Sequence, residues 1–286
     1  MIERMLQVPT IAELRRHVGE ARRQGKRIGF VPTMGYLHDG HLSLVKKARE
    51  TCDFVVMSIF VNPLQFGPNE DFERYPRDIE RDRELARSAG VDLLFTPSVE
   101  EMYPRQVLTT VSVAQVSEPL CGQSRPGHFD GVATVVLKLF HIVQPDAAFF
   151  GQKDAQQLAV ISQMVEDLSV PVEIVPCPIV REPDGLAMSS RNVYLSPEER
   201  RQATVLYRSL KQAEAWLKEG VPLDEIKERM AAMITAEPLA EIDYVEVLTY
   251  PRLTPVDTAS PGQRLIFALA VRFGRTRLID NMMVTV

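Results

Sequence analysis

The stretch that decides the fold is Arg27–Thr51, RIGFVPTMGYLHDGHLSLVKKARET. Its first part, Arg27–Thr33, is apolar enough to predict a buried strand, and His41–Thr51 has the pattern of a helix. The turn between them contains Gly35 and Gly40, residues that adopt backbone conformations closed to other residues. The stretch therefore predicts one strand–turn–helix step of a larger α/β fold.

The same alternation continues on both sides of this step. A helix with one apolar side is expected around His17. Further strands are predicted at Asp53–Val61, Asp92–Thr96, Val107–Val113, Asp146–Phe150 and Val172–Val175, and helices at Glu70–Gly90, Gly131–Val143 and Lys153–Leu168. We predict an α/β, Rossmann-like fold with a mostly parallel sheet and helices on both faces. Sheets of this kind bind ligands at the carboxyl ends of their strands.

The pattern changes after Arg181. Residues 182–195 are rich in glycine, proline, serine and asparagine, which predicts a loop, and Ser196-Pro197-Glu198-Glu199 is a helix-capping sequence. Two helices and three antiparallel strands are expected to follow, at Pro197–Leu217, Leu223–Ala236, Ile242–Leu248, Arg264–Phe273 and Thr276–Ile279. We predict a Rossmann-like domain over residues 1–181 and a smaller α+β C-terminal lid domain over residues 182–286.

Composition excludes several classes of protein. The formal charge of −5 over 286 residues argues against broad binding to nucleic acid or to anionic membranes. Three isolated cysteines fit buried thiols in a reducing compartment better than a disulfide framework or a zinc site. The first residues lack the apolar core of a signal peptide, and no apolar run reaches about 18 residues. We expect a soluble, cytoplasmic protein.

The turn at the start of the first long helix carries the strongest chemical signal. His38 and His41 are three residues apart and share one side of a helical turn, and Gly40 allows a bulky anion to approach the backbone. The amino end of a helix adds N–H groups and a positive dipole. This suits a triphosphate whose α-phosphorus gains charge during displacement. Spacing alone leaves open a metal site or a turn with two incidental histidines.

Three other segments strengthen the phosphate interpretation. Lys153 and Gln157 begin a helix directly after a strand, and Ser189, Ser190 and Arg191 lie in the predicted loop between the domains. A lysine and an arginine bind phosphate, and a loop can close over a nucleotide. The segment FVNPLQFG, residues 60–67, adds two neutral amides after another strand. Each segment alone also fits a solvated helix start, a linker or a turn.

Taken together, these segments resemble a known family. In chain order they read PTMGYLHDGH, SIFVNPLQFG, RYPRD, SRPGHFDGV, FFGQKDAQQL, GLAMSSRNVYL and RTRLIDN. The set is similar to the AMP-forming pantoate–β-alanine ligases, within the HxGH adenylyl-transferase superfamily. The HxGH element is shared by many nucleotidyltransferases, whereas FVNPxQF, KDxQQL and SSRN in combination are specific to this family. The resemblance covers essentially the whole chain.

The resemblance implies an ATP-dependent ligase for pantothenate and coenzyme A biosynthesis. Pantoate would attack the α-phosphorus of ATP to give pantoyl adenylate and pyrophosphate, and β-alanine would then displace AMP to give pantothenate. His41, His38 and Lys153 are the expected catalytic residues, with His41 as proton donor. The residues expected to bind ATP are Met34, Gly35, Tyr36, Leu37, His38, Asp39, Gly40, His41, Gly151, Gln152, Lys153, Asp154, Val180, Met188, Ser189, Ser190 and Arg191.

The resemblance also assigns the remaining ligands. Gln65 and Gln157 match two pantoate-binding glutamines, Asn62 supports that pocket, and Gln65 is a candidate contact for β-alanine. Mg²⁺ is expected with ATP, held mainly by phosphate oxygens. Asp82 matches an acidic position near the metal, although it also lies on a charged helix of the kind that usually faces solvent. Arg125 matches a family residue at the pocket rim, and a homodimer is expected.

One position departs from the family pattern, and two other functions compete with the ligase. Gln152 stands where the family commonly has glutamate, which removes a negative charge near the triphosphate. An HxGH nucleotidyltransferase with a phosphorylated acceptor would need further cationic groups for that phosphate. A non-catalytic nucleotide-binding regulator would be expected to have lost part of the machinery. The glutamines and the complete set of histidine, lysine, serine and arginine residues favour the ligase.

Overall fold

The computed structural model describes residues 5–68 and 70–286, and they divide into two compact units. The first contains residues up to 113, 125–152 and 160–178; the second contains 114–124, 153–159 and 179–286. The first turn of α7 (Ala155–Asp167) belongs to the second unit because Ala155 and Ala159 pack there against Leu120 and Ile266. The predicted domain boundary at residue 181 stays a prediction.

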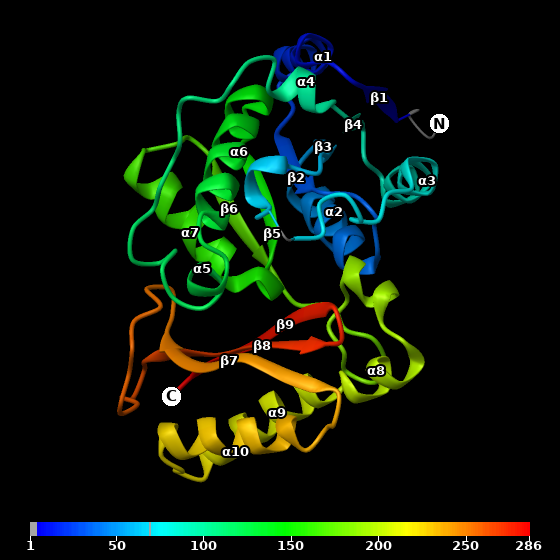
Figure 1. The fold of residues 1–286 in the computed structure, drawn as a ribbon. Coiled ribbons are helices and arrows are strands. Elements are labelled where there is room, and N and C mark those ends of the chain that lie inside the picture. The colour runs from blue at the N-terminus through cyan, green and yellow to red at the C-terminus, as the bar shows by residue number, and fades with distance from the viewer. Residues whose placement is uncertain (1–4, 69) are drawn as a thin grey trace. The chain divides into compact units, whose positions relative to one another are not determined.

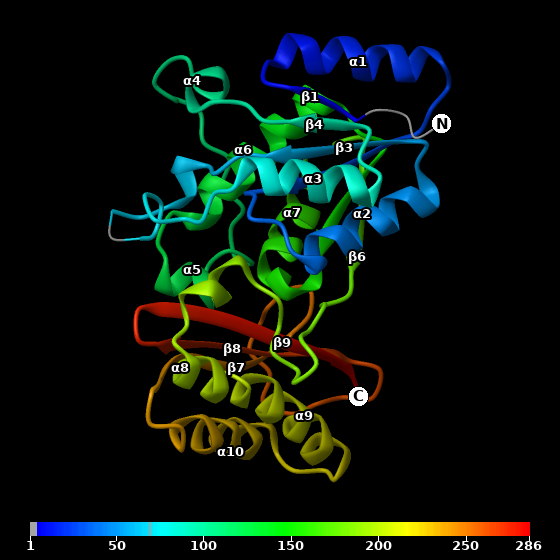
Figure 2. The same ribbon diagram turned by 90° about the vertical axis from the view of Figure 1, so that its right-hand side faces the viewer.

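The first unit is built on a parallel sheet of six strands (Figures 1 and 2). Its order is β1-β4-β3-β2-β5-β6, so the order reverses between β2 and β5. The strands are β1 (Leu6–Val8), β2 (Ile28–Thr33), β3 (Phe54–Ile59), β4 (Leu93–Phe95), β5 (Ala147–Gly151) and β6 (Glu173–Cys177). The predicted α/β class with a mostly parallel sheet is confirmed.

Helices cover both faces of this sheet because neighbouring residues of a strand point to opposite sides. On one side Val31 of β2 and Phe149 of β5 pack with α2 (Asp39–Thr51) and α3 (Ile79–Ala89), which lie side by side (Figure 2). On the other side Phe30 and Phe150 meet Phe140 of α6 (His128–Val143), and α1 (Ile11–Arg23) packs beside α6. A short α4 (Val99–Met102) follows β4.

The second unit has an antiparallel sheet in the order β7-β8-β9, as expected from the sequence. Figure 1 shows α9 and α10 along one face of it, where Leu210 and Met230 join a core with Phe267. Its elements are α5 (Cys121–Ser124), η3 (Ser190–Tyr194), α8 (Pro197–Gln202), α9 (Val205–Lys218), α10 (Leu223–Thr235), β7 (Ala240–Thr249), β8 (Arg264–Phe273) and β9 (Thr276–Thr285).

Three details differ from the predicted elements. Val107–Val113 forms no strand; the Val111 N–H donates to the Thr134 hydroxyl instead of a neighbouring strand. The helix predicted from Glu70 begins only at Ile79, after Asp78 caps it. Helix α8 ends at Gln202, so the predicted single helix is two. All three cysteines are buried and free, as expected. Over residues 5–68 and 70–286, no helix has both the length and the apolar character needed to span a bilayer.

Candidate active site

The loop between β2 and α2 lies at the carboxyl end of the sheet and requires glycine at position 35. Gly35 has a φ of 86°, and a Cβ there would lie 2.9 Å from the Ile59 Cγ2 and 3.0 Å from an Asp82 oxygen. Tyr36 follows with a φ of 50°, also in the left-handed region. The loop therefore has a close-fitting backbone that a larger side chain would displace.

Asp82 of α3 holds this loop. Its two carboxylate oxygens accept hydrogen bonds from the main-chain N–H groups of Tyr36 and Leu37, each at 2.7 Å, and the residue is 1% exposed. Burial raises the pKa of the Asp82 carboxyl, while the two N–H groups and Arg81 act in the opposite direction. The structure thus gives Asp82 a task inside the protein; its proximity to a metal stays a prediction.

His38 and His41 form a reciprocal cap at the amino end of α2. The Gly40 N–H donates to Nδ1 of His38 at 3.1 Å, and the His38 N–H donates to Nδ1 of His41 at 3.3 Å. A nitrogen that accepts a hydrogen bond carries no proton, so each neutral ring has its proton on Nε2. The ring centroids are 4.1 Å apart. Both side chains therefore carry an Nε2–H donor beside the positive end of a helix, an arrangement suited to phosphate oxygens.

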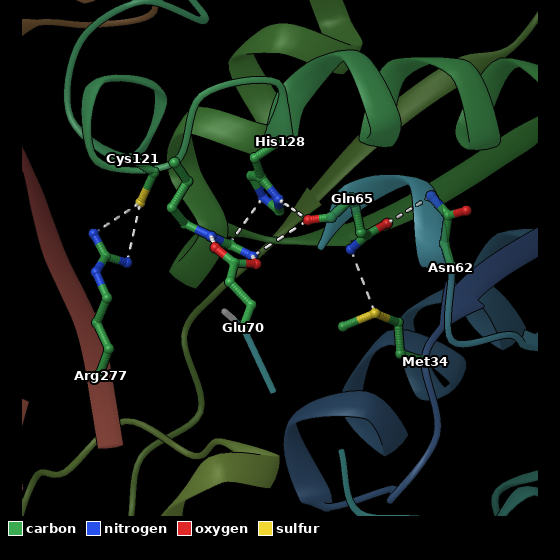
Figure 3. Close-up of polar contacts among 8 residues, drawn as sticks. Met34, Asn62, Gln65, Glu70, Cys121, His128 and Arg277 are labelled. Carbon is green, nitrogen blue, oxygen red and sulfur yellow. Dashed lines mark hydrogen bonds and ion pairs between the residues drawn. The ribbon is translucent and has the colours of Figure 1, made fainter. Parts of the chain in front are cut away.

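The segment after β3 carries the two predicted amides. Asn62 is 1% exposed and caps the short helix η1 (Pro63–Gln65). Gln65, the last residue of η1, is 9% exposed. This segment packs closely on α6, where a Cβ on Gly131 would lie 2.2 Å from the Leu64 carbonyl oxygen. The main-chain carbonyl of Gln65 lies 2.8 Å from Nδ1 of His128 (Figure 3). The same carbonyl accepts a bond from Arg125, which also pairs with Glu70.

A cavity of about 310 Å³ opens at the carboxyl ends of β2, β3 and β4. Met34, Gly35 and Tyr36 line it from the loop after β2, Phe60 lines it from the end of β3, and Asp82 lines it from α3. Parallel sheets bind their ligands at this edge, most often where the strand order reverses, which here is between β2 and β5. The cavity lies on the β3 and β4 side of that point, and its lining includes none of His38, His41 and Gln65. The predicted loop residues Met34–Tyr36 thus border a cavity within the first unit, although Gly35 itself is buried.

Of the predicted residues, Gly151 ends β5 and Gln152 begins η2 (Gln152–Asp154), both in the first unit. Lys153, Asp154 and Gln157 belong to the second unit. Lys153 lies in η2, and its carbonyl accepts a 2.9 Å bond from Nδ2 of Asn281 on β9. Gln156, the residue before the predicted Gln157, is buried. Its side chain bonds to main-chain groups of Cys121, Val116 and Pro119, so its role is structural. Gln157, one residue further, is only half-buried.

The predicted loop over Met188–Arg191 is anchored at its base. The Met188 N–H donates to the Val180 carbonyl at 3.0 Å, and Arg181 pairs with Ala187 as an isolated bridge. Arg181 also makes a bidentate ion pair with Asp280, at 2.6 and 2.9 Å. Ser189 caps η3 by accepting from the Arg191 N–H. Ser190 is buried, and the movement expected of this loop stays a prediction.

The described residues offer little to a metal ion. They contain no cluster of three or more histidine, cysteine, aspartate or glutamate side chains able to hold one, and both Asp82 oxygens already accept main-chain hydrogen bonds. This donor set fits a magnesium ion only if phosphate oxygens supply most of its ligands.

Sequence reasoning missed several residues that hold these groups in place. Asp280 and Asn281 lie in the RTRLIDN motif, to which the resemblance assigns no role, and Tyr103 lies in no motif. Each contacts a residue far away in the sequence. Asn281 bonds to Lys153 across 128 positions, Asp280 pairs with Arg181 across 99, and Tyr103 bonds to Asn62 across 41. Local patterns carry no signal for such contacts.

Comparisons with known proteins identify the family. The pantoate-beta-alanine ligase family model matches residues 7–283. Pantothenate synthetase from Caldicellulosiruptor saccharolyticus is 58% identical over 283 residues, which is 99% of this chain and 100% of that protein. The enzyme of that name from Pelotomaculum thermopropionicum is 60% identical over 278 residues, covering 97% of this chain and 98% of that protein.

Solved structures agree with the sequence relatives. Pantothenate synthetase from Thermus thermophilus has a TM-score of 0.92 and 52% identity, covering 97% of this chain and 99% of that one. Pantoate-beta-alanine ligase from Francisella tularensis, complexed with beta-gamma ATP and beta-alanine, has a TM-score of 0.81 and 36% identity, covering 98% of each chain. The match of the family model and of these full-length relatives shows that this chain belongs to the pantoate–β-alanine ligase family.

Proposed function

We propose that this chain, a pantoate–β-alanine ligase, works in two half-reactions on ATP. A carboxylate is a poor acyl donor because its leaving group would be oxide. In the first half-reaction a pantoate oxygen bonds to the α-phosphorus while the bond to the pyrophosphate oxygen breaks. In the second, the β-alanine amine bonds to the acyl carbon, AMP leaves, and the nitrogen loses a proton. The products are pantothenate, AMP and pyrophosphate.

The observation that carries this proposal is the reciprocal cap at α2. Because the Nδ1 atoms of His38 and His41 accept main-chain N–H groups, the proton of each neutral ring lies on Nε2. We assign these two Nε2–H groups to the phosphate oxygens on which charge develops during displacement, with His41 as the proton donor. The loop Met34–His41 surrounds the nucleotide on this side.

We assign the second unit's cationic groups to the same nucleotide. Lys153 and Arg191 contact phosphates, with Ser189 and Ser190 as hydroxyl donors and Met188 beside them. Gly151, Gln152, Asp154 and Val180 contribute to ribose and adenine binding. Gln65 and Gln157 hold pantoate, since neutral amides bind its hydroxyls and a carboxylate oxygen without a tight ion pair that would weaken the nucleophile. Gln152 tunes ATP affinity and leaves the reaction unchanged.

The wider expectations rest on the resemblance. A Mg²⁺ ion bound with ATP would be held mainly by phosphate oxygens and would supply positive charge to offset that of the leaving pyrophosphate. We further propose a homodimer that works in the cytoplasm.

Isotope exchange tests the first half-reaction. Purified protein with ATP, Mg²⁺ and pantoate is expected to exchange labelled pyrophosphate into ATP, and added β-alanine is expected to release AMP and pantothenate. Absence of exchange that depends on pantoate would refute the proposal. Nucleotide transfer to a phosphorylated acceptor would support the rival nucleotidyltransferase.

A further inference from the structure

The Gln65 amide has two ends of opposite polarity, a carbonyl that accepts and an NH₂ that donates. The end that faces the substrate decides which substrate atoms the residue can bind. Electron density alone seldom distinguishes the two ends, but the hydrogen-bond network does. In this chain the network begins at Asn62, three residues earlier.

The orientation of Asn62 is fixed by main-chain groups, which cannot change their roles. Its Oδ1 accepts from the Leu64 N–H at 3.3 Å, and a main-chain N–H only donates. Its Nδ2 donates to the Gly131 carbonyl at 3.1 Å, and a carbonyl only accepts. A reversed Asn62 amide would place donor against donor and acceptor against acceptor at these two positions.

Tyr103 reinforces this orientation. Its hydroxyl donates to Oδ1 of Asn62 at 2.8 Å, the shortest of the bonds to that amide. Burial raises the pKa of the Tyr103 phenol, so the hydroxyl keeps its proton at neutral pH and remains a donor. Lys138 lies 5.0 Å from the centre of the Tyr103 ring and donates to the Met102 carbonyl. Tyr103 is therefore fixed by contacts at both ends of its side chain, with Lys138 at the ring and with Asn62 at the hydroxyl.

The polarity of Asn62 passes to Gln65. Nδ2 of Asn62 donates to Oε1 of Gln65 at 3.1 Å, which leaves the Gln65 NH₂ on the opposite side. Figure 3 shows that nitrogen directed to Met34, with its Nε2 at 3.4 Å from the Met34 sulfur. A thioether is a weak acceptor, so a carboxylate or hydroxyl oxygen would replace it with a gain in energy.

We propose that Tyr103 and Asn62 are positioning residues that lock the Gln65 amide so that it offers an N–H to an accepting oxygen of pantoate. This inference rests on the proposed function, in which Gln65 binds pantoate. It adds a direction to that contact and two residues that set it. A substrate whose facing atom only donates would meet the wrong end of the amide and would be rejected.

Asn62→Asp is the sharpest test, because it keeps the size of the side chain and replaces the donor by an acceptor. The Gln65 amide would then turn its NH₂ to the introduced carboxylate and its carbonyl to pantoate. In pyrophosphate exchange, which needs no β-alanine, we expect the KM for pantoate to rise on the order of 10- to 100-fold, with the KM for ATP within about twofold. An unchanged pantoate KM, or an equal rise in both values, would overturn the proposal.

Tyr103→Phe provides a milder variant in case Asn62→Asp fails to fold. It removes one hydroxyl, and we expect kcat/KM for pantoate to fall about three- to tenfold while the KM for ATP holds. Tyr250→Phe is the matched control, since that hydroxyl donates to the Ala155 carbonyl at 3.4 Å in the second unit. We expect the control to keep the wild-type pantoate KM. Equal effects of the two variants would contradict a specific role for Tyr103.

The wild-type assay separates this inference from the proposed function. If the wild-type protein shows no exchange that depends on pantoate, the function itself fails. If it shows exchange, while both variants keep the wild-type pantoate KM, the function stands and the positioning role fails.

Discussion

His38 combines two tasks that are usually given to different side chains. As the N-cap of α2 it accepts the Gly40 N–H through Nδ1, a position where serine, threonine, asparagine and aspartate are preferred. Through Nε2 it is assigned to phosphate. The cap explains why the ring is held with its second nitrogen as the donor, because the helix terminus itself selects the tautomer.

Two substitutions at His38 separate the cap from the chemistry. His38→Asn keeps an N-cap acceptor and removes the imidazole, so we expect a melting temperature near wild type and an exchange rate lower by on the order of 10²–10³. His38→Ala removes both the N-cap acceptor and the imidazole. We expect its unfolding free energy to be about 1 kcal/mol lower than that of His38→Asn. Thermal melts beside exchange assays measure the two effects. An active His38→Asn would show that the residue serves only as a cap.

At the scale of the elements, contacts between segments far apart in sequence hold the site. Sequence patterns predicted five of the six parallel strands, and the three residues of β1 are too few to show a periodicity. They also predicted helix at Glu70–Asp78, where the chain instead loops so that the Arg77 guanidinium reaches the carbonyls of Phe72 and Tyr75. A charged segment has the same composition in either conformation. The Arg77 contacts are local, and the ion pair of Glu70 with Arg125, 55 positions away, adds a long-range contact that the composition does not show.

The Glu70–Arg125 pair ties that loop to the segment leading into α6, with a bidentate contact of 2.6 Å at each oxygen. Burial opposes ionisation, but the Arg125 bonds and charge leave the pKa of Glu70 below its usual value. Because the folded pKa is lower, this contribution to stability is present above the unfolded pKa of about 4.3 and is lost as pH falls through the folded value. We expect Glu70→Gln to lower the melting temperature at pH 7, with the difference from wild type shrinking as the pH falls below about 4.3. A difference that does not shrink on acidification would contradict this origin.

Strand β9 acts on Lys153 through Asn281, which donates to the Lys153 carbonyl at 2.9 Å. If this bond places the lysine, Asn281→Ala is expected to slow exchange about tenfold in the wild-type background. It should add little once Lys153→Ala has removed the ammonium, because residues that act as a unit are not additive. A double-mutant cycle measures this coupling. Additive losses would show that Asn281 serves only the stability of the second unit.

At the scale of the whole molecule, the net charge of −5 gives no hint of an anion site, which depends on the local grouping of a few residues. The motifs placed His38, His41 and Lys153 where a strand passes into a helix, and the observed elements agree, because local backbone patterns determine such positions. What the motifs could not supply were the partners Tyr103, Asp280 and Asn281, since tertiary contacts alone bring them to Asn62, Arg181 and Lys153 respectively.

The proposed homodimer is a property of the whole chain, and an exposed apolar segment offers a place to test it. Leu108 is 86% exposed in the segment that was expected to be an edge strand and is not one, and a large exposed apolar side chain is a candidate contact with a second copy. We expect light scattering to give twice the chain mass of 32.2 kDa and Leu108→Asp to shift the protein toward one chain mass at low concentration. Leu168→Asp, on a leucine that is 55% exposed just after α7, is the matched control and should stay dimeric. A wild-type mass of one chain would refute the dimer, and a dimeric Leu108→Asp would place the interface elsewhere.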